Sequence, residues 1–139
     1  MKRLLSTTVA TTALAVGLVI NTSSPAAAAE EAPGCPSVTQ IGSTGYIKSN
    51  GEPVVSVKQF KGCGKNWAYA YVWKSFRDSH RSWSISAWIQ AGASSEGWRS
   101  GPGIEVWSDG THTLSVCTQA LGQLRFASQT LTGHTDTRC

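Results

Sequence analysis

The sequence lacks the short motifs that would mark a catalyst. It contains no nucleophile elbow, no metal-binding helix motif and no glycine-rich phosphate loop. Most of its acids stand at turns or beside proline and glycine, where solvated carboxylates are ordinary. Its histidines, His80, His112 and His134, stand in or near predicted turns, and nothing in their spacing brings them together. We therefore expect a protein that is not an enzyme and that carries no cofactor.

Long runs of one charge are missing as well. Beyond Lys58, Lys61 and Lys65, the basic residues are scattered along the chain, which argues against nucleic acid as a partner. The 139 residues have a formal net charge of +4, with 12 basic and 8 acidic side chains. Two of the basic residues lie in the first three positions, so the rest of the chain has 10 bases and 8 acids, or +2.

Residues 1–29 have the pattern of a secretory signal peptide. A positive start is followed by the uncharged, apolar residues 4–20, a polar segment and four alanines at 26–29. Small residues at that point suit signal peptidase. The apolar stretch is shorter than the roughly 20 residues of a spanning helix and has no cationic flank beyond it, which disfavours a membrane anchor. The sequence predicts cleavage after Ala29 and a secreted, extracellular protein.

Cysteine is sparse but even in number, and all of it lies beyond residue 29. An even number of cysteines in an exported chain predicts disulfides, here two, with three ways of pairing left open by sequence order. No two cysteines are close enough in sequence to be the ligand pairs of a zinc site, so we expect no metal. The cysteines are Cys35, Cys63, Cys117 and Cys139.

Sustained helical spacing of apolar residues is absent, and period-two patterns take its place. Residues 30–36, with two acids and two prolines, are predicted to be a flexible acidic tail, and residues 37–139 a single domain. Asn50-Gly51 and Asp109-Gly110 predict tight hairpin turns, and the Gly- and Ser-rich residues 92–103 predict a loop. About seven strands are predicted, at 45–48, 54–60, 67–76, 82–91, 104–108, 111–119 and 124–131. This pattern favours a small antiparallel, all-β sandwich or barrel, similar to immunoglobulin domains.

Six tryptophans are the most unusual feature of the composition. Residues 67–73 alternate aromatic and small side chains, so one face of that strand is aromatic. Because a row of large aromatics in water is poorly soluble, we expect this face to lie in the core. The alternative is an exposed ribbon that stacks on sugars or binds a protein. The aromatic face comprises Trp67, Tyr69, Tyr71 and Trp73.

Two further tryptophans are candidates for a binding surface. One breaks the serine-lined face of the strand at 82–91, and the other precedes an arginine in the predicted glycine-rich loop. The acids of the predicted tail are a second candidate, because an extended tail can dock onto a partner. The candidate partner-binding residues are Trp88, Trp98, Arg99, Glu30 and Glu31.

Two segments resemble the tendamistat-type secreted α-amylase inhibitors. These are Gly62-Cys63 with the alternating strand after it, and Cys117 with the Ala-Leu-Gly-Gln string at 120–123 and Cys139. The resemblance implies a β-sandwich of six strands, with disulfides from Cys35 to Cys63 and from Cys117 to Cys139. Residues 79–113 have no equivalent in that family. Its inhibitory Trp-Arg-Tyr triplet has no counterpart between residues 35 and 63, and the nearest string, at 98–100, lies elsewhere. The resemblance therefore implies the fold without amylase inhibition.

The leader, acidic tail, size and disulfides are also similar to those of small adaptor subunits of secreted toxin particles. Such subunits join a lectin-like subunit to a toxin stalk. A rigid, disulfide-bonded domain that displays aromatic and arginine side chains is well suited to bind another protein. We therefore expect a secreted, non-enzymatic module that binds another extracellular protein, as an adaptor subunit of a complex or as an inhibitor. The alternative is a carbohydrate-binding module that uses exposed Trp and Tyr.

Overall fold

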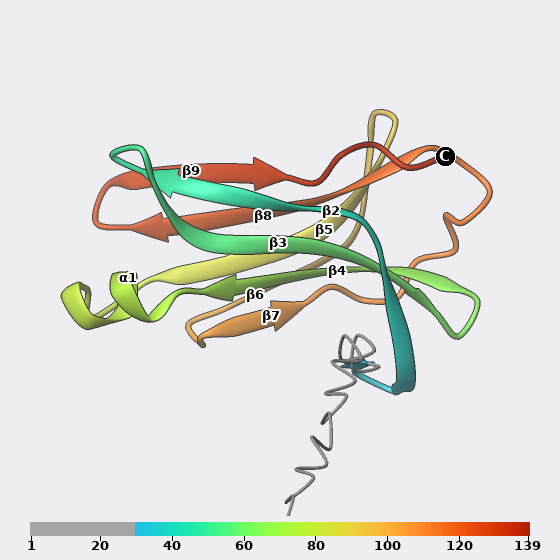
Figure 1. Ribbon diagram of the computed structural model, residues 1–139, viewed down its shortest axis with the longest axis horizontal. Coiled ribbons are helices and arrows are strands. Elements are labelled where there is room, and N and C mark those ends of the chain that lie inside the picture. The colour runs from blue at the N-terminus through green and yellow to red at the C-terminus, as the bar shows by residue number, and fades with distance from the viewer. Residues whose placement is uncertain (1–29) are drawn as a thin grey trace, which may run out of the picture.

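The computed structural model describes residues 30–139 as two antiparallel sheets packed face to face (Figure 1). The first sheet has the strand order β1-β2-β3-β4-β7 and the second β6-β5-β8-β9. The predicted all-β sandwich is confirmed, with nine strands within residues 30–139 where about seven were expected. The predicted signal peptide lies outside the described residues. The elements are β1 (Glu30–Ala32), β2 (Cys35–Ser49), β3 (Glu52–Gly62), β4 (Lys65–Val72), α1 (Lys74–Ser79), β5 (Ser84–Ala91), β6 (Ser94–Gly101), β7 (Glu105–Trp107), β8 (Thr118–Phe126) and β9 (Gln129–His134).

One predicted hairpin is confirmed and the other is wrong. Asn50 and Gly51 join β2 to β3 with φ of 52° and 82°, the two left-handed residues that a tight hairpin turn requires. Asp109-Gly110 does not reverse the chain in this way. Strand β7 pairs with β4, and the Asp109 amide bonds to the Gly97 carbonyl at 2.9 Å. The chain then pairs Thr111 with Asn66 and continues as a loop to β8.

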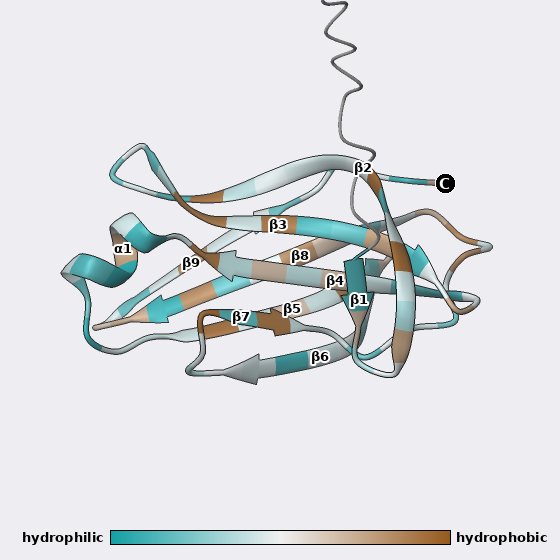
Figure 2. Ribbon diagram, turned by 60° about the horizontal axis from the view of Figure 1, so that its bottom comes forward, coloured by the Kyte–Doolittle hydropathy of each residue, from teal (hydrophilic) through white to brown (hydrophobic). Residues whose placement is uncertain are grey.

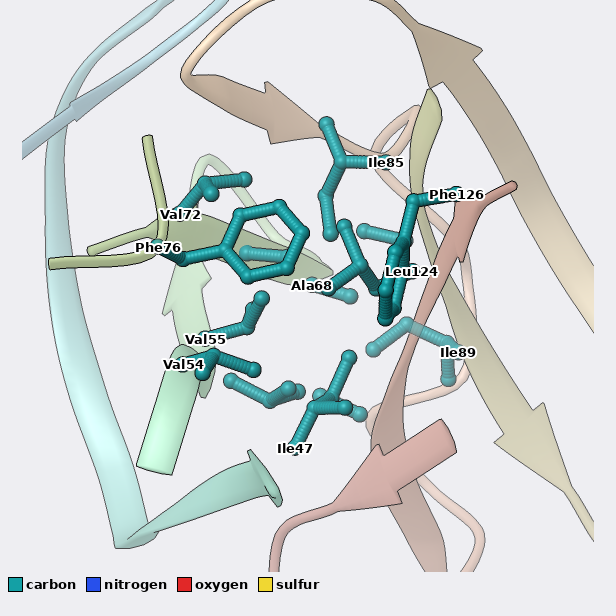
Figure 3. Packing of buried hydrophobic residues seen from close by; sticks show 14 residues of the cluster. Ile47, Val54, Val55, Ala68, Val72, Phe76, Ile85, Ile89, Leu124 and Phe126 are labelled. Atoms are coloured by element: carbon teal, nitrogen blue, oxygen red, sulfur yellow. The ribbon is translucent and has the colours of Figure 1, made fainter. Parts of the chain in front are cut away.

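The main core lies between the two sheets and is almost entirely aliphatic (Figure 3). Strand β4 contributes its small side chains, Ala68, Ala70 and Val72, each fully buried. The prediction that the aromatic face of this strand lies in the core is therefore wrong. Small residues are sufficient on β4 because Phe76 and Phe126, from beyond the strand, fill the space between the sheets.

The aromatic face of β4 lies on the outer side of the first sheet, and part of it is covered there. Strand β1 and the start of β2 lie over it (Figure 2), and Trp67 is only 5% exposed. A second buried cluster consists of Ala32, Cys35, Val38, Phe60 and Trp67. Residues 30–36, predicted to be a flexible tail, instead form a strand paired to β2 and a buried cysteine. Burying the second cluster stabilises this pairing.

Each disulfide joins two cysteines that follow one another in the sequence. Cys35 bonds to Cys63 and Cys117 to Cys139, which close segments of 28 and 22 residues. This is the pairing that the tendamistat resemblance implied. Restricting the unfolded chain in this way stabilises the fold by about 3 to 4 kcal/mol per bridge on the loop-entropy account.

Within residues 30–139, none of the helical structure has the length and apolar character needed to cross a membrane.

Candidate binding surface

The outer face of the second sheet is built from alternation along β5. Its odd-numbered residues from Ile85 to Ile89 enter the core, so the even-numbered ones point outward. Strand register extends this outer face across the whole sheet, because residues directly opposite one another share a face. One cross-strand row consists of four uncharged polar residues, Ser100, Ser86, Gln123 and Thr132.

A β-bulge places Trp98 on the same face. Residues 92–103 were predicted to be a loop, but residues 94–101 form strand β6, paired with β5. The register slips by one residue between Ala87 and Ile89, opposite Gly97 and Trp98. Gly97 has a φ of 68°, the left-handed conformation that suits glycine at a bulge. The extra residue turns the Trp98 side chain outward, next to Trp88.

The two indoles form a stacked pair. Their ring centroids are 4.1 Å apart and their planes are inclined by 26°. Trp88 lies underneath and is 6% exposed, whereas Trp98 lies on top and is 46% exposed. Burial of one ring face against Trp88 therefore leaves much of Trp98 open to solvent. The pair is a flat, apolar platform on a sheet face that is otherwise largely polar.

Hydrogen bonds fix the lower ring and connect it to the polar surroundings. The Trp88 indole Nε1 donates to Gln90 Oε1 at 3.2 Å. The same oxygen accepts from Ser95 Oγ at 2.8 Å, and Gln90 Nε2 donates to the Gly92 carbonyl at 2.8 Å. Gln90 and Gln119 also line a small hollow of about 210 Å³ at this end of the sheet. Amide and hydroxyl groups thus lie beside the platform.

The structure does not bring the other candidate residues to this platform. Arg99 points to the opposite side of β6 and pairs with Asp109 at 2.8 Å. Glu30 belongs to the first sheet, where it lies 3.6 Å from Lys58, and Glu31 is exposed beside it on β1. Of the predicted partner-binding residues, Trp88 and Trp98 alone lie on this platform.

The aromatic side chains of residues 67–73, on the outer side of the first sheet, are held by contacts within the protein. Trp73 donates its Nε1 proton to Ser56 Oγ at 2.7 Å, and Arg77 lies 5.9 Å from the Tyr71 ring centroid. Tyr69 donates its hydroxyl to Glu105 at 2.5 Å. Burial and this carboxylate raise the pKa of Tyr69 above its ordinary value. These rings are half-buried and partnered, so they offer less free surface than Trp98 does.

The titratable groups of residues 30–139 are dispersed over the fold. The part of the chain that the structure describes contains no group of three His, Cys, Asp or Glu residues able to hold a metal. His80 stacks on Phe76 with the ring centroids 3.8 Å apart, and the His134 ring lies against the Thr135 carbonyl. His112 is exposed on the loop before β8. The three histidines lie in separate surroundings, each with its own neighbours.

Sequence reasoning missed one exposed apolar feature. Leu114 and Val116 belong to residues 111–119, which were predicted to be a strand, but they lie on an irregular loop and are largely exposed. Two apolar residues separated by one position look the same in sequence whether a strand buries them or a loop displays them.

Comparison of the chain with protein families, curated proteins and solved structures finds no match.

Proposed function

We propose that this protein is a secreted, non-enzymatic carbohydrate-binding module, with Trp98 as the platform on which a sugar ring stacks. The observation that carries the proposal is the Trp88–Trp98 stack, which leaves the upper indole 46% exposed on the face of a rigid sheet. Two disulfides suit such a protein to an oxidising extracellular setting.

The surroundings of the platform favour a sugar over an apolar protein surface. A sugar ring has a C–H-rich face that can cover an indole, while its edge presents hydroxyl groups that donate and accept hydrogen bonds. The outer face of the second sheet supplies both kinds of contact, with Trp98 for the ring face and Gln123 and Thr132, from the polar cross-strand row, for the hydroxyls. Protein-binding hot spots are usually enclosed by residues that exclude water. Beyond Trp88 and Leu121, which lies opposite Trp88 on β8, the outer face around Trp98 is polar.

The proposal is tested by titrating the intrinsic tryptophan fluorescence with cellulose, chitin and starch oligosaccharides. Tyr46 provides a matched control, because it is exposed to a similar degree, 44%, on the outer face of the other sheet. At least one oligosaccharide series should change the emission and saturate. Trp98→Ala should weaken that binding by about tenfold or more, which corresponds to about 1.4 kcal/mol, and Tyr46→Ala should leave it unchanged. Flat titrations with all three series would contradict the proposal.

A further inference from the structure

The strands of the second sheet place no carboxylate on its outer face. Strand register assigns to this face the even-numbered residues of β5, the odd-numbered residues of β8, and their partners on β6 and β9. The one acid of the four strands, Glu96, lies opposite the core residue Ile89, so it belongs to the other face. It accepts a hydrogen bond there from Ser94 Oγ at 2.8 Å. A ligand that lies across the outer face therefore meets no negative charge from these strands.

One permanent cation lies on this face. Arg125 of β8 stands opposite Ser84 on β5 and Thr130 on β9, both uncharged. Its side chain is exposed, and none of the ion pairs formed within residues 30–139 includes it. The acid that precedes β5 in the chain, Asp78, is paired with Lys74 at 2.6 Å. The Arg125 guanidinium is thus available to an acidic group of a ligand.

Arg125 lies two cross-strand rows from the tryptophan platform. Trp88 pairs with Leu121 of β8, and the next two rows contain Gln123 and Arg125. At about 3.3 Å per residue, the four residues from Leu121 to Arg125 span roughly 13 Å. One sugar ring on the platform does not reach that far, but a short oligosaccharide does.

The row between the platform and Arg125 can hydrogen-bond the intervening sugars. Its two serines are bonded to each other, from Ser86 Oγ to Ser100 Oγ at 3.0 Å. The other two members are Gln123, which is half-buried, and Thr132, which is exposed. These two uncharged side chains lie between an apolar ring and a cation.

We infer that the ligand of this face is an acidic polysaccharide, in which one sugar stacks on Trp98 and the carboxylate of a sugar a few units along the chain pairs with Arg125. The inference rests on the proposed sugar binding and names the class of sugar. A guanidinium binds a carboxylate through two parallel hydrogen bonds. Because no acid of the four strands faces outward, the remaining carboxylates of such a chain meet no like charge from this sheet.

Two matched hexasaccharides test the inference. Cellohexaose and the hexamer of glucuronic acid with the same linkages differ only in that each primary alcohol is oxidised to a carboxylate. Each is titrated at neutral pH into the disulfide-bonded protein and followed by calorimetry and tryptophan fluorescence. The acidic hexamer should bind about fivefold more tightly, the upper end for one exposed ion pair. High salt should reduce this preference. Hexaglutamate, which has carboxylates without sugar rings, should bind more weakly than either.

Variants locate the preference on the sheet. Arg125→Gln should lower the affinity for the acidic hexamer to that for cellohexaose, and Arg125→Lys should keep most of the preference. Trp98→Ala should weaken the binding of both hexamers. Lys61→Gln is the matched control, because it removes an exposed cation from the first sheet, and it should change neither affinity.

The outcomes separate this inference from the proposed function. Equal affinity for the two hexamers, or binding of chitin or starch oligosaccharides but of neither hexamer, would overturn the inference and leave sugar binding in place. A preference that survives Arg125→Gln, or hexaglutamate that binds as tightly as the acidic hexamer, would overturn it as well, since the charge would then be recognised elsewhere or without a sugar. If no oligosaccharide of any series binds, both proposals fail.

Discussion

The backbone amide of Asp109 donates to the carbonyl of Gly97 at 2.9 Å. This bond connects the chain after β7, in one sheet, to the bulge in β6, in the other. It holds the bulge that turns Trp98 outward. A Cβ atom on Gly97 would lie 2.7 Å from the Asp109 carbonyl oxygen and 2.8 Å from Thr111 Cγ2. Gly97 is thus required for its positive φ and for this close approach.

Gly97→Ala should lower the free energy of unfolding by at least about 2 kcal/mol, from left-handed strain and the steric clash together. Urea unfolding followed by fluorescence measures this change. Gly101→Ala is the matched control on the same strand, because nothing lies within 4 Å of its added methyl group. Equal stability of the two variants would show that the bulge is not held as described.

Trp98→Ala should cost about 1 kcal/mol of stability from the lost stack. It should also expose Trp88 to water, since Trp98 lies on top of that ring. The measurements are urea unfolding and the indole N–H resonance of Trp88, which should move when the upper ring no longer covers it. Trp98→Phe keeps an aromatic ring in place and should retain most of the stability. An unchanged Trp88 indole resonance in Trp98→Ala would mean that the two rings are apart in solution.

Asn66→Ala should destabilise the protein by about 2 kcal/mol or more, because it leaves the buried hydroxyls of Thr113 and Thr118 short of a hydrogen-bond partner. Its local effect should be faster hydrogen exchange of the Thr111 amide, which bonds to the Asn66 carbonyl. Thr130→Ala, at an exposed position on β9, is the control and should change neither quantity. Unaltered exchange at Thr111 would contradict the role given to this network.

Stability should fall as the pH rises above about 10, the ordinary pKa of tyrosine. The pKa of Tyr69 is raised in the folded state, first by burial and then by its hydrogen bond to Glu105. Above pH 10 the unfolded state therefore loses this proton while the folded state keeps it, which favours unfolding. Tyr69→Phe removes the effect, so its stability should fall less steeply between pH 10 and 11. Parallel curves for the two proteins would contradict this account.

The predictable parts of the fold are those that a few residues close together in the sequence determine. Asn50-Gly51 identifies its hairpin because both residues tolerate positive φ. The alternation in β5 identifies a strand with one polar face, and it placed Trp88 on that face correctly. Both signals are short-range, and neither depends on what packs against the strand.

The parts that were not predictable depend on long-range contacts. Strand β6 reads as a loop because its Gly and Ser residues have low strand propensity, and pairing with β5 overrides this. The buried face of β4 could not be chosen, since it depends on Phe76 and Phe126 filling the core from elsewhere. The stacking of Trp98 on Trp88 requires both strand β6 and its bulge. The sequence therefore indicated each tryptophan as a candidate for binding, but it did not show that the two rings are in contact.

The role of Trp98 as the sugar platform is tested most directly by following the indole N–H resonances of the six tryptophans while an oligosaccharide that binds is titrated into the protein. Single Trp→Phe variants assign the signals. The Trp98 and Trp88 resonances should shift together and saturably, because the sugar stacks on one ring and the other lies directly beneath it. The resonances of Trp67, Trp73, Trp83 and Trp107 should stay in place. Shifts confined to Trp73, or to any tryptophan of the first sheet, would place sugar binding elsewhere and contradict the assignment of Trp98 as the platform.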